Sequence, residues 1–108
     1  MSDLHIKSEQ AIKIAELNDE FRQNGKWMVT PSILLLPDVH GLYMTIKEYS
    51  SFTEDNDPYG EHDFGSLDWF EEKVFWKIDY YDTKYARWYD PLSTRCVRVL
   101  TVYLACEH

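Results

Sequence analysis

The sequence predicts an α+β fold in two layers, with an antiparallel sheet of about four strands and an N-terminal and a C-terminal helix packed on one face. Apolar residues recur every three or four positions near both ends of the chain, as in helices, and alternate with polar residues between them, as in strands. With 108 residues, 44% of them hydrophobic, the chain can bury one modest core. We therefore expect a single domain over residues 1–108.

The first element predicted is an amphipathic helix from Ser2 to Asn24. Its apolar stripe consists of Ala11, Ile14, Leu17 and Phe21. Asn24-Gly25 is typical of a left-handed helix end, and the following Lys26–Thr30 is predicted to be a strand.

The next segments are expected to add strands. Ser32–Leu36 lies between two prolines, so it is an edge strand or an interrupted strand at best. In Gly41–Phe52, alternating Leu42, Met44 and Ile46 favour a half-buried strand. Residues 53–63 form a polar loop, and Phe64–Trp69 begins a further strand.

Lys73–Asp82 has the strongest strand pattern, with apolar side chains on one face: Val74, Trp76, Ile78 and Tyr80. Asp90-Pro91 then predicts a helix start. In a C-terminal helix, five mainly apolar residues would lie on one face, which are Leu92, Cys96, Val99, Leu100 and Tyr103. The β-branched residues around Val97–Val102 favour a strand instead; of the two, we favour the helix.

The formal net charge of -8 is concentrated in one part of the chain. Thr53–Glu72 contains eight carboxylates and no Lys or Arg, whereas the remainder of the chain is close to neutral. An acidic chain does not suit direct binding to nucleic acid or to an anionic membrane, because both ligands need an excess of cations. We expect neither as a partner.

Three interpretations of this acidic segment compete. One is a solvated loop and hairpin that prevents sheet edges from pairing. A second is an interaction surface that imitates the closely spaced phosphates of a duplex and uses aromatic anchors. The residues of that candidate partner-binding surface are Glu54, Asp55, Asp57, Tyr59, Glu61, Asp63, Asp68, Trp69, Glu71 and Glu72.

The third interpretation is a metal site. Asp55, Asp57 and Gly60 imitate the start of a calcium loop, but Ser66 stands where a bidentate Glu is required. Metal ligands and cofactors are therefore not expected.

A catalytic alternative centres on His62, with Glu61 and Asp63 as orienting acid or base in a small hydrolase or metal-dependent enzyme. The same residues also suit a structured turn, in which side chains bind backbone groups. We favour the turn and expect a protein that is not an enzyme.

The compartment expected is the cytoplasm. Cys96 and Cys106 are predicted to be too far apart for a disulfide and to remain reduced. Charges throughout Met1–Glu20 do not fit a signal peptide, and no apolar run has membrane-spanning length.

Two blocks resemble a known family. Asn56–Gly65 (NDPYGEHDFG) and Lys73–Asp82 (KVFWKIDYYD) are similar to the small bacterial proteins of domain of unknown function 3768, as are Arg98–Val102 and the Asn18-Asp19 pair. The resemblance carries over no catalytic residue. It implies a setting on phages, plasmids and other mobile elements, where small acidic proteins often inhibit host defence, as anti-CRISPR and anti-restriction proteins do.

The resulting functional expectation is a small acidic inhibitor or adaptor. It would bind the basic nucleic-acid-binding surface of a host protein complex, as a monomer or homodimer. A dimerising structural module that uses an exposed sheet edge is the remaining alternative.

Overall fold

The computed structural model describes the backbone of residues 2–107 and the side chains of residues 9–107. In chain order its elements are α1 (Ser2–Asn24), β1 (Trp27–Val29), α2 (Pro31–Leu34), α3 (Val39–Lys47), β2 (Phe64–Trp69), β3 (Glu72–Tyr81), β4 (Val97–Leu104) and a short 3-10 helix, η1 (Ala105–Glu107). The α+β class predicted from the sequence is confirmed.

The four strands form one mixed sheet in the order β1-β4-β3-β2. β2 pairs antiparallel with β3, and β3 antiparallel with β4. The expected all-antiparallel sheet is wrong at one pair, because β1 runs parallel to β4, with Trp27 opposite Leu100. Two parallel strands need a long crossover connection between them. Here α2, α3 and the β2–β3 hairpin, which lie between β1 and β4 in sequence, provide that connection.

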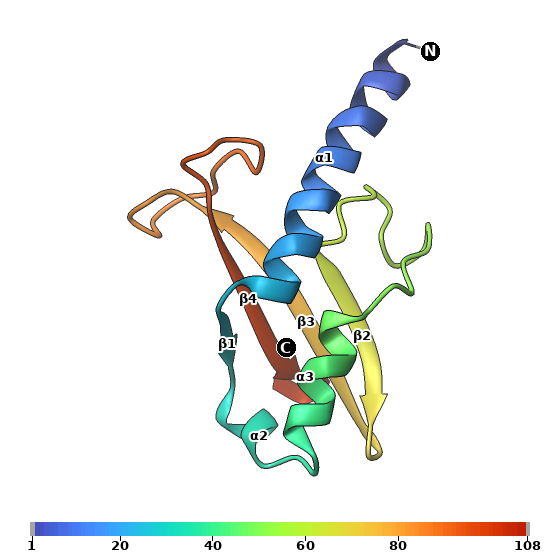
Figure 1. Ribbon diagram of the computed structural model, residues 1–108, viewed down its shortest axis with the longest axis vertical. Helices are drawn as coiled ribbons and strands as arrows, with labels where there is room; N and C mark the ends of the chain where they lie inside the picture. The colour runs from blue at the N-terminus through green and yellow to red at the C-terminus, as the bar shows by residue number, and fades with distance from the viewer. Residues whose placement is uncertain (1, 108) are drawn as a thin grey trace.

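The three α-helices lie over one face of the sheet (Figure 1). β3 turns Val74, Trp76 and Ile78 toward them, and β4 turns Leu100 and Val102 the same way. The helices contribute four buried residues to this core, which are Ile14, Ile33, Leu42 and Ile46. The alternation that predicted β3 from the sequence is therefore the pattern that fills the core.

α1 is present with the bounds that the sequence predicts, but its buried stripe is different. Leu17 is 44% exposed, whereas Asn18 and Arg22 are 0% and 3% exposed. The buried face thus follows Ile14, Asn18 and Arg22, four residues apart, and it includes two polar side chains.

The strand predicted over Gly41–Phe52 is wrong, because α3 occupies most of it. Leu42 and Ile46 are both fully buried, while Met44 is 44% exposed. Residues i, i+2 and i+4 share one face of a strand, and residues i and i+4 also share one face of a helix. The spacing of the apolar residues in this short segment therefore fits both structures. The Asp38 side chain caps the helix by accepting from the Gly41 amide at 3.2 Å.

The edge strand suggested for Ser32–Leu36 is also replaced by a helix. α2 begins at Pro31, a position that suits proline because the first helical N–H groups need no intrahelical acceptor. Ile33 is its fully buried residue.

The helix predicted from Asp90 onward is wrong, and the competing strand is correct as β4. Asp90 and Pro91 belong to a turn, in which the Asp90 carboxylate accepts from the Leu92 amide at 2.9 Å. The β-branched residues after Cys96 favour the extended backbone, and β3 supplies their ladder partners.

Candidate functional site

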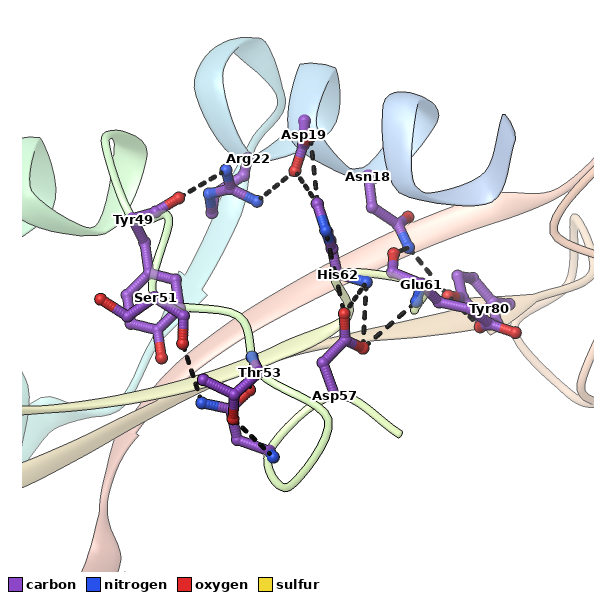
Figure 2. A network of polar contacts seen from close by, with 11 residues as sticks. Asn18, Asp19, Arg22, Tyr49, Ser51, Thr53, Asp57, Glu61, His62 and Tyr80 are labelled. Atoms are coloured by element: carbon purple, nitrogen blue, oxygen red, sulfur yellow. Dashed lines mark hydrogen bonds and ion pairs between the residues drawn. The ribbon is translucent and has the colours of Figure 1, made fainter. Parts of the chain in front are cut away.

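A polar network joins α1 to the loop of residues 48–63 and to the sheet (Figure 2). We call it the α1–loop network. Its side chains are Asn18, Asp19, Arg22, Asp57, Glu61, His62, Tyr80 and Arg98.

Asn18 is the fully buried centre of this network. Its Nδ2 donates to the Tyr80 hydroxyl at 2.8 Å and to the Glu61 carbonyl oxygen at 2.9 Å. Its Oδ1 accepts from Arg98 Nε at 2.6 Å. The Tyr80 hydroxyl in turn donates to Glu61 Oε1 at 2.9 Å. Because both amide protons and the amide oxygen of Asn18 are used, its burial carries little unsatisfied polarity.

Arg22 links α1 to the end of α3. Its Nε donates to the Ile46 carbonyl at 3.1 Å, and its Nη2 to the Tyr49 carbonyl at 3.2 Å. Nη1 forms an ion pair of 3.0 Å with Asp19. The guanidinium also lies over the Trp76 ring, 5.2 Å from its centroid. A buried cation thus adds a second donor to the Ile46 carbonyl, which also accepts from the Tyr49 amide, and supplies a donor to the Tyr49 carbonyl just beyond the helix.

Asp57 organises the loop from within. Its side chain is 5% exposed and accepts from the amides of Glu61 at 3.2 Å and His62 at 3.3 Å. The Asp57 amide donates to the Thr53 carbonyl at 2.8 Å. These bonds form the structured turn that the sequence favoured for this motif.

His62 lies between two carboxylates. Nδ1 is 3.0 Å from Asp19 Oδ1, and Nε2 is 3.8 Å from Asp57 Oδ2. The imidazole stacks on the Phe52 ring with centroids 3.9 Å apart. Both nitrogens face acids of the network and one ring face is covered, so the ring is held as a link between α1 and the loop.

Burial and neighbouring acids change two ionisation equilibria beside the network. Burial, followed by repulsion from Glu61, raises the pKa of Asp63 to about 6. Burial also raises the pKa of Tyr80 well above its usual range, so its hydroxyl keeps the proton that it donates to Glu61.

The described residues 9–107 contain no group of three His, Cys, Asp or Glu side chains arranged to hold a metal ion. In the same part of the chain, no helix is long and apolar enough to cross a membrane. Cys96 and Cys106 are both free.

The acidic residues singled out from the sequence fall into three groups. Asp57, Glu61 and Asp63 are partly or wholly buried in or beside the network. Glu54, Asp55 and Tyr59 are exposed on the loop, and Tyr59 is 80% exposed. The third group lies at the other end of β2. β2, with six extended residues or a length of about 20 Å, lies between these two exposed groups along the chain.

We call the third group the hairpin end. It consists of Asp68, Trp69, Phe70, Glu71 and Glu72, where β2 turns into β3. Asp68 is paired with Lys73 at 3.0 Å. Trp69 donates through Nε1 to the Pro37 carbonyl at 2.7 Å, which ties the hairpin end to the loop between α2 and α3 (Figure 1).

The turn of this hairpin has an unfavourable backbone for its residues. Phe70 and Glu71 have φ values of 46° and 69°, and Trp69 and Glu72 on either side are paired. Two positive φ angles in a two-residue loop characterise a type I′ turn, where Asn-Gly is strongly preferred. A side chain there costs on the order of 1 kcal/mol per residue. Phe70 is nevertheless 61% exposed.

Residues 13–107 match the family model described as "Protein of unknown function (DUF3768)". The chain therefore belongs to this family, as its two motif blocks suggested. No curated protein matches the chain, and no solved structure does.

Reasoning from hydrophobic periodicity missed the centre of the network. The apolar stripe predicted for the first helix includes neither Asn18 nor Arg22, and Tyr80 is predicted only as a member of a strand face. The one available signal was the family resemblance, which included Asn18-Asp19 together with the Asn56–Gly65 block. These two segments are in contact through the Asp19–His62 and Asn18–Glu61 pairs.

Proposed function

We propose that this protein is a small inhibitor or adaptor that binds a basic, nucleic-acid-handling protein complex in the cytoplasm and catalyses no reaction. The proposal assigns the contact to the hairpin end. The observation that carries it is the exposed Phe70 at a strained turn, with Glu71 and Glu72 beside it.

Binding interfaces gain most of their energy from a few aromatic anchors surrounded by polar residues. Phe70 is such an anchor, and Trp69 packs against it edge to face at 5.5 Å. Glu71 and Glu72 are exposed, and no ion pair is found for either in the described part of the chain. Their charges can therefore steer a basic partner into contact. A turn that keeps an unfavourable backbone to display Phe70 supports a functional use of that ring.

The loop group supports a weaker form of the same proposal. Glu54, Asp55 and Tyr59 are exposed, but Asp57 and Glu61 turn their carboxylates toward backbone and side-chain donors inside the protein. Of these four carboxylates, only those of Glu54 and Asp55 are therefore exposed to a partner at this end. The proposal also states that the protein catalyses no reaction. The fixed position of His62 between Asp19 and Asp57 supports this part of the proposal.

Two double charge reversals test the site. One double variant carries Glu71→Lys and Glu72→Lys, and the other carries Glu54→Lys and Asp55→Lys. The two variants change the net charge by the same amount, at opposite ends of β2. A photo-crosslinking phenylalanine analogue in place of Phe70 captures the partner from a bacterial lysate, and the purified partner is then titrated with each variant.

The proposal expects a basic partner that binds nucleic acid and loses it when this protein is added. It also expects the reversal at Glu71 and Glu72 to weaken binding at least tenfold more than the reversal at the loop. Equal effects of the two reversals, or a partner that retains its nucleic acid, would contradict the proposed site or mode of action.

A further inference from the structure

β4 extends beyond the strand that covers its outer edge. β1 has three residues, which pair with Leu100–Val102, whereas β4 begins at Val97. The parallel ladder therefore stops before Val97–Val99. Figure 1 shows β4 continuing past the start of β1 toward the loop that joins it to β3.

The main chain at Arg98 is directed toward this uncovered edge. The Val102 carbonyl accepts from the Thr30 amide at 3.1 Å, so it points to the side of the sheet where β1 lies. Alternate residues of a strand direct their main-chain groups to the same side. Arg98, four residues before Val102, thus presents its N–H and C=O there. Its side chain is fixed elsewhere, by Asn18 and by the Pro91 carbonyl.

Two cavities flank this edge. One, of about 540 Å³, lies between α1 and the first residues of β4, and Leu17, Phe21 and Val97 line it. The other, of about 580 Å³, is lined by residues that include Phe21, Trp27 and Tyr85. Phe21 and Arg98 border both cavities, and we call the combined surface the β4 groove.

Apolar surface in the β4 groove is exposed to water. Leu17 is 44% exposed, Met28 63% and Tyr85 62%. Large apolar side chains that gather beside an open strand edge are typical of sites that bind extended segments of other chains.

The chain segment that borders the groove through Tyr85, Val97 and Arg98 has a charge opposite to that of the whole protein. Residues 84–98 contain four bases and one acid, a formal charge of +3, whereas the chain carries -8. Lys26 also lines the groove, and Glu20 is the acid on the α1 side. An acidic segment would therefore be attracted here and repelled from the Thr53–Glu72 segment, which carries the excess negative charge.

We infer that the β4 groove binds an extended peptide of alternating acidic and apolar residues, added as a strand beside Val97–Val99. The peptide main chain pairs with Arg98, its apolar side chains contact Phe21 and Tyr85, and its carboxylates lie near Lys26 and the basic 84–98 segment. This site is separate from the hairpin end. A protein with both sites is an adaptor that connects a basic partner to an acidic one.

The test titrates the ¹⁵N-labelled full chain with the peptide acetyl-Glu-Val-Asp-Val-Glu-Val-Asp-amide. The expected result is a saturable shift of the Val97, Arg98 and Val99 amide signals. A second peptide, N-methylated at alternate residues on its pairing edge, removes the main-chain donors and is expected to bind at least tenfold more weakly. A third, with Lys in place of each acid, is expected to leave the Val97, Arg98 and Val99 signals unshifted.

The protein variants are Leu17→Glu and the matched control Ile12→Glu. Both replace an exposed apolar residue of α1 with an acid, and only Leu17 lines the groove. Leu17→Glu is expected to weaken peptide binding about tenfold relative to Ile12→Glu. Absence of saturable binding, equal binding of the N-methylated or basic peptide, or equal effects of the two variants would overturn the inference. These outcomes are independent of the result at the hairpin end.

Discussion

Asn18 Nδ2 donates a 2.8 Å hydrogen bond to the Tyr80 hydroxyl, which lies 62 residues further along the chain. The bond joins the C-terminal part of α1 to the end of β3. Through Glu61, which contacts both residues, it also fixes the loop that contains His62. The α1–loop network is thus a structural link between three parts of the chain that are distant in sequence.

Asn18→Ala is expected to lower the free energy of unfolding by about 2–4 kcal/mol. The Glu61 carbonyl, the Tyr80 hydroxyl and Arg98 Nε each lose a partner at a buried or half-buried position. Urea denaturation measures the change. Gln23→Ala, at an exposed position of the same helix, is the control and should change stability by less than about 0.5 kcal/mol. Equal stability of the two variants would show that the network contributes nothing to folding.

Arg22→Met is expected to destabilise the fold by about 2–4 kcal/mol, although it keeps most of the aliphatic packing. The loss comes from the Arg22 hydrogen bonds to the carbonyls of Ile46 and Tyr49, of which the Ile46 carbonyl keeps a second donor in the Tyr49 amide. Arg22→Lys should recover only part of this loss, because an ammonium cannot reproduce the forked geometry of guanidinium. Thermal unfolding compares the three proteins. Full recovery by Lys would mean that charge alone, and not the fork, fixes α3.

Asp63 makes stability depend on pH in the acidic range. Its folded-state pKa of about 6 lies above the ordinary 3.8, so the folded protein binds this proton more tightly than the unfolded chain. Its contribution is therefore fully present below about pH 4 and is lost as the pH rises through 6. Asp63→Asn should raise stability at pH 7 by about 1 kcal/mol, after allowance for screening of a partly exposed group. It should also flatten the change between pH 4 and 6.

The control for this pH dependence is Asp68→Asn, at an exposed position of the hairpin end. It should leave the slope between pH 4 and 6 as in the unchanged protein. If Asp63→Asn instead lowered stability at pH 7, the ionised carboxylate would have to be favourable in the fold, contrary to the raised pKa.

The sequence was sufficient for elements whose pattern had one structural solution. β3 alternates over ten residues, longer than a helical pattern could imitate, and α1 is too long and too regularly polar to be a strand. In the segment that became α3, three apolar residues two apart satisfied both periodicities, and only packing against the sheet selected the helix. The parallel position of β1 depends on the return of β4 from the far end of the chain, which local pattern does not encode.

The residues of the candidate sites were likewise predictable only in part. Composition located the acidic segment and its aromatic residues, including the four hairpin-end residues named from the sequence, which are Asp68, Trp69, Glu71 and Glu72. It could not separate carboxylates that face solvent from those that face backbone donors, as Asp57 does. Which carboxylates face solvent depends on where the loop folds against α1. That position is fixed by residues such as Asn18, whose burial is determined by tertiary contacts.

We propose that the hairpin turn retains an unfavourable backbone because this backbone presents Phe70 to a basic partner. The most direct measurement replaces Phe70→Asn together with Glu71→Gly, which gives the turn its preferred residues. Unfolding free energy and affinity for the captured partner are then measured on the same preparation. We predict a gain in stability of about 1–2 kcal/mol and a loss of binding of at least tenfold. A variant that is more stable and binds with unchanged affinity would contradict the claim.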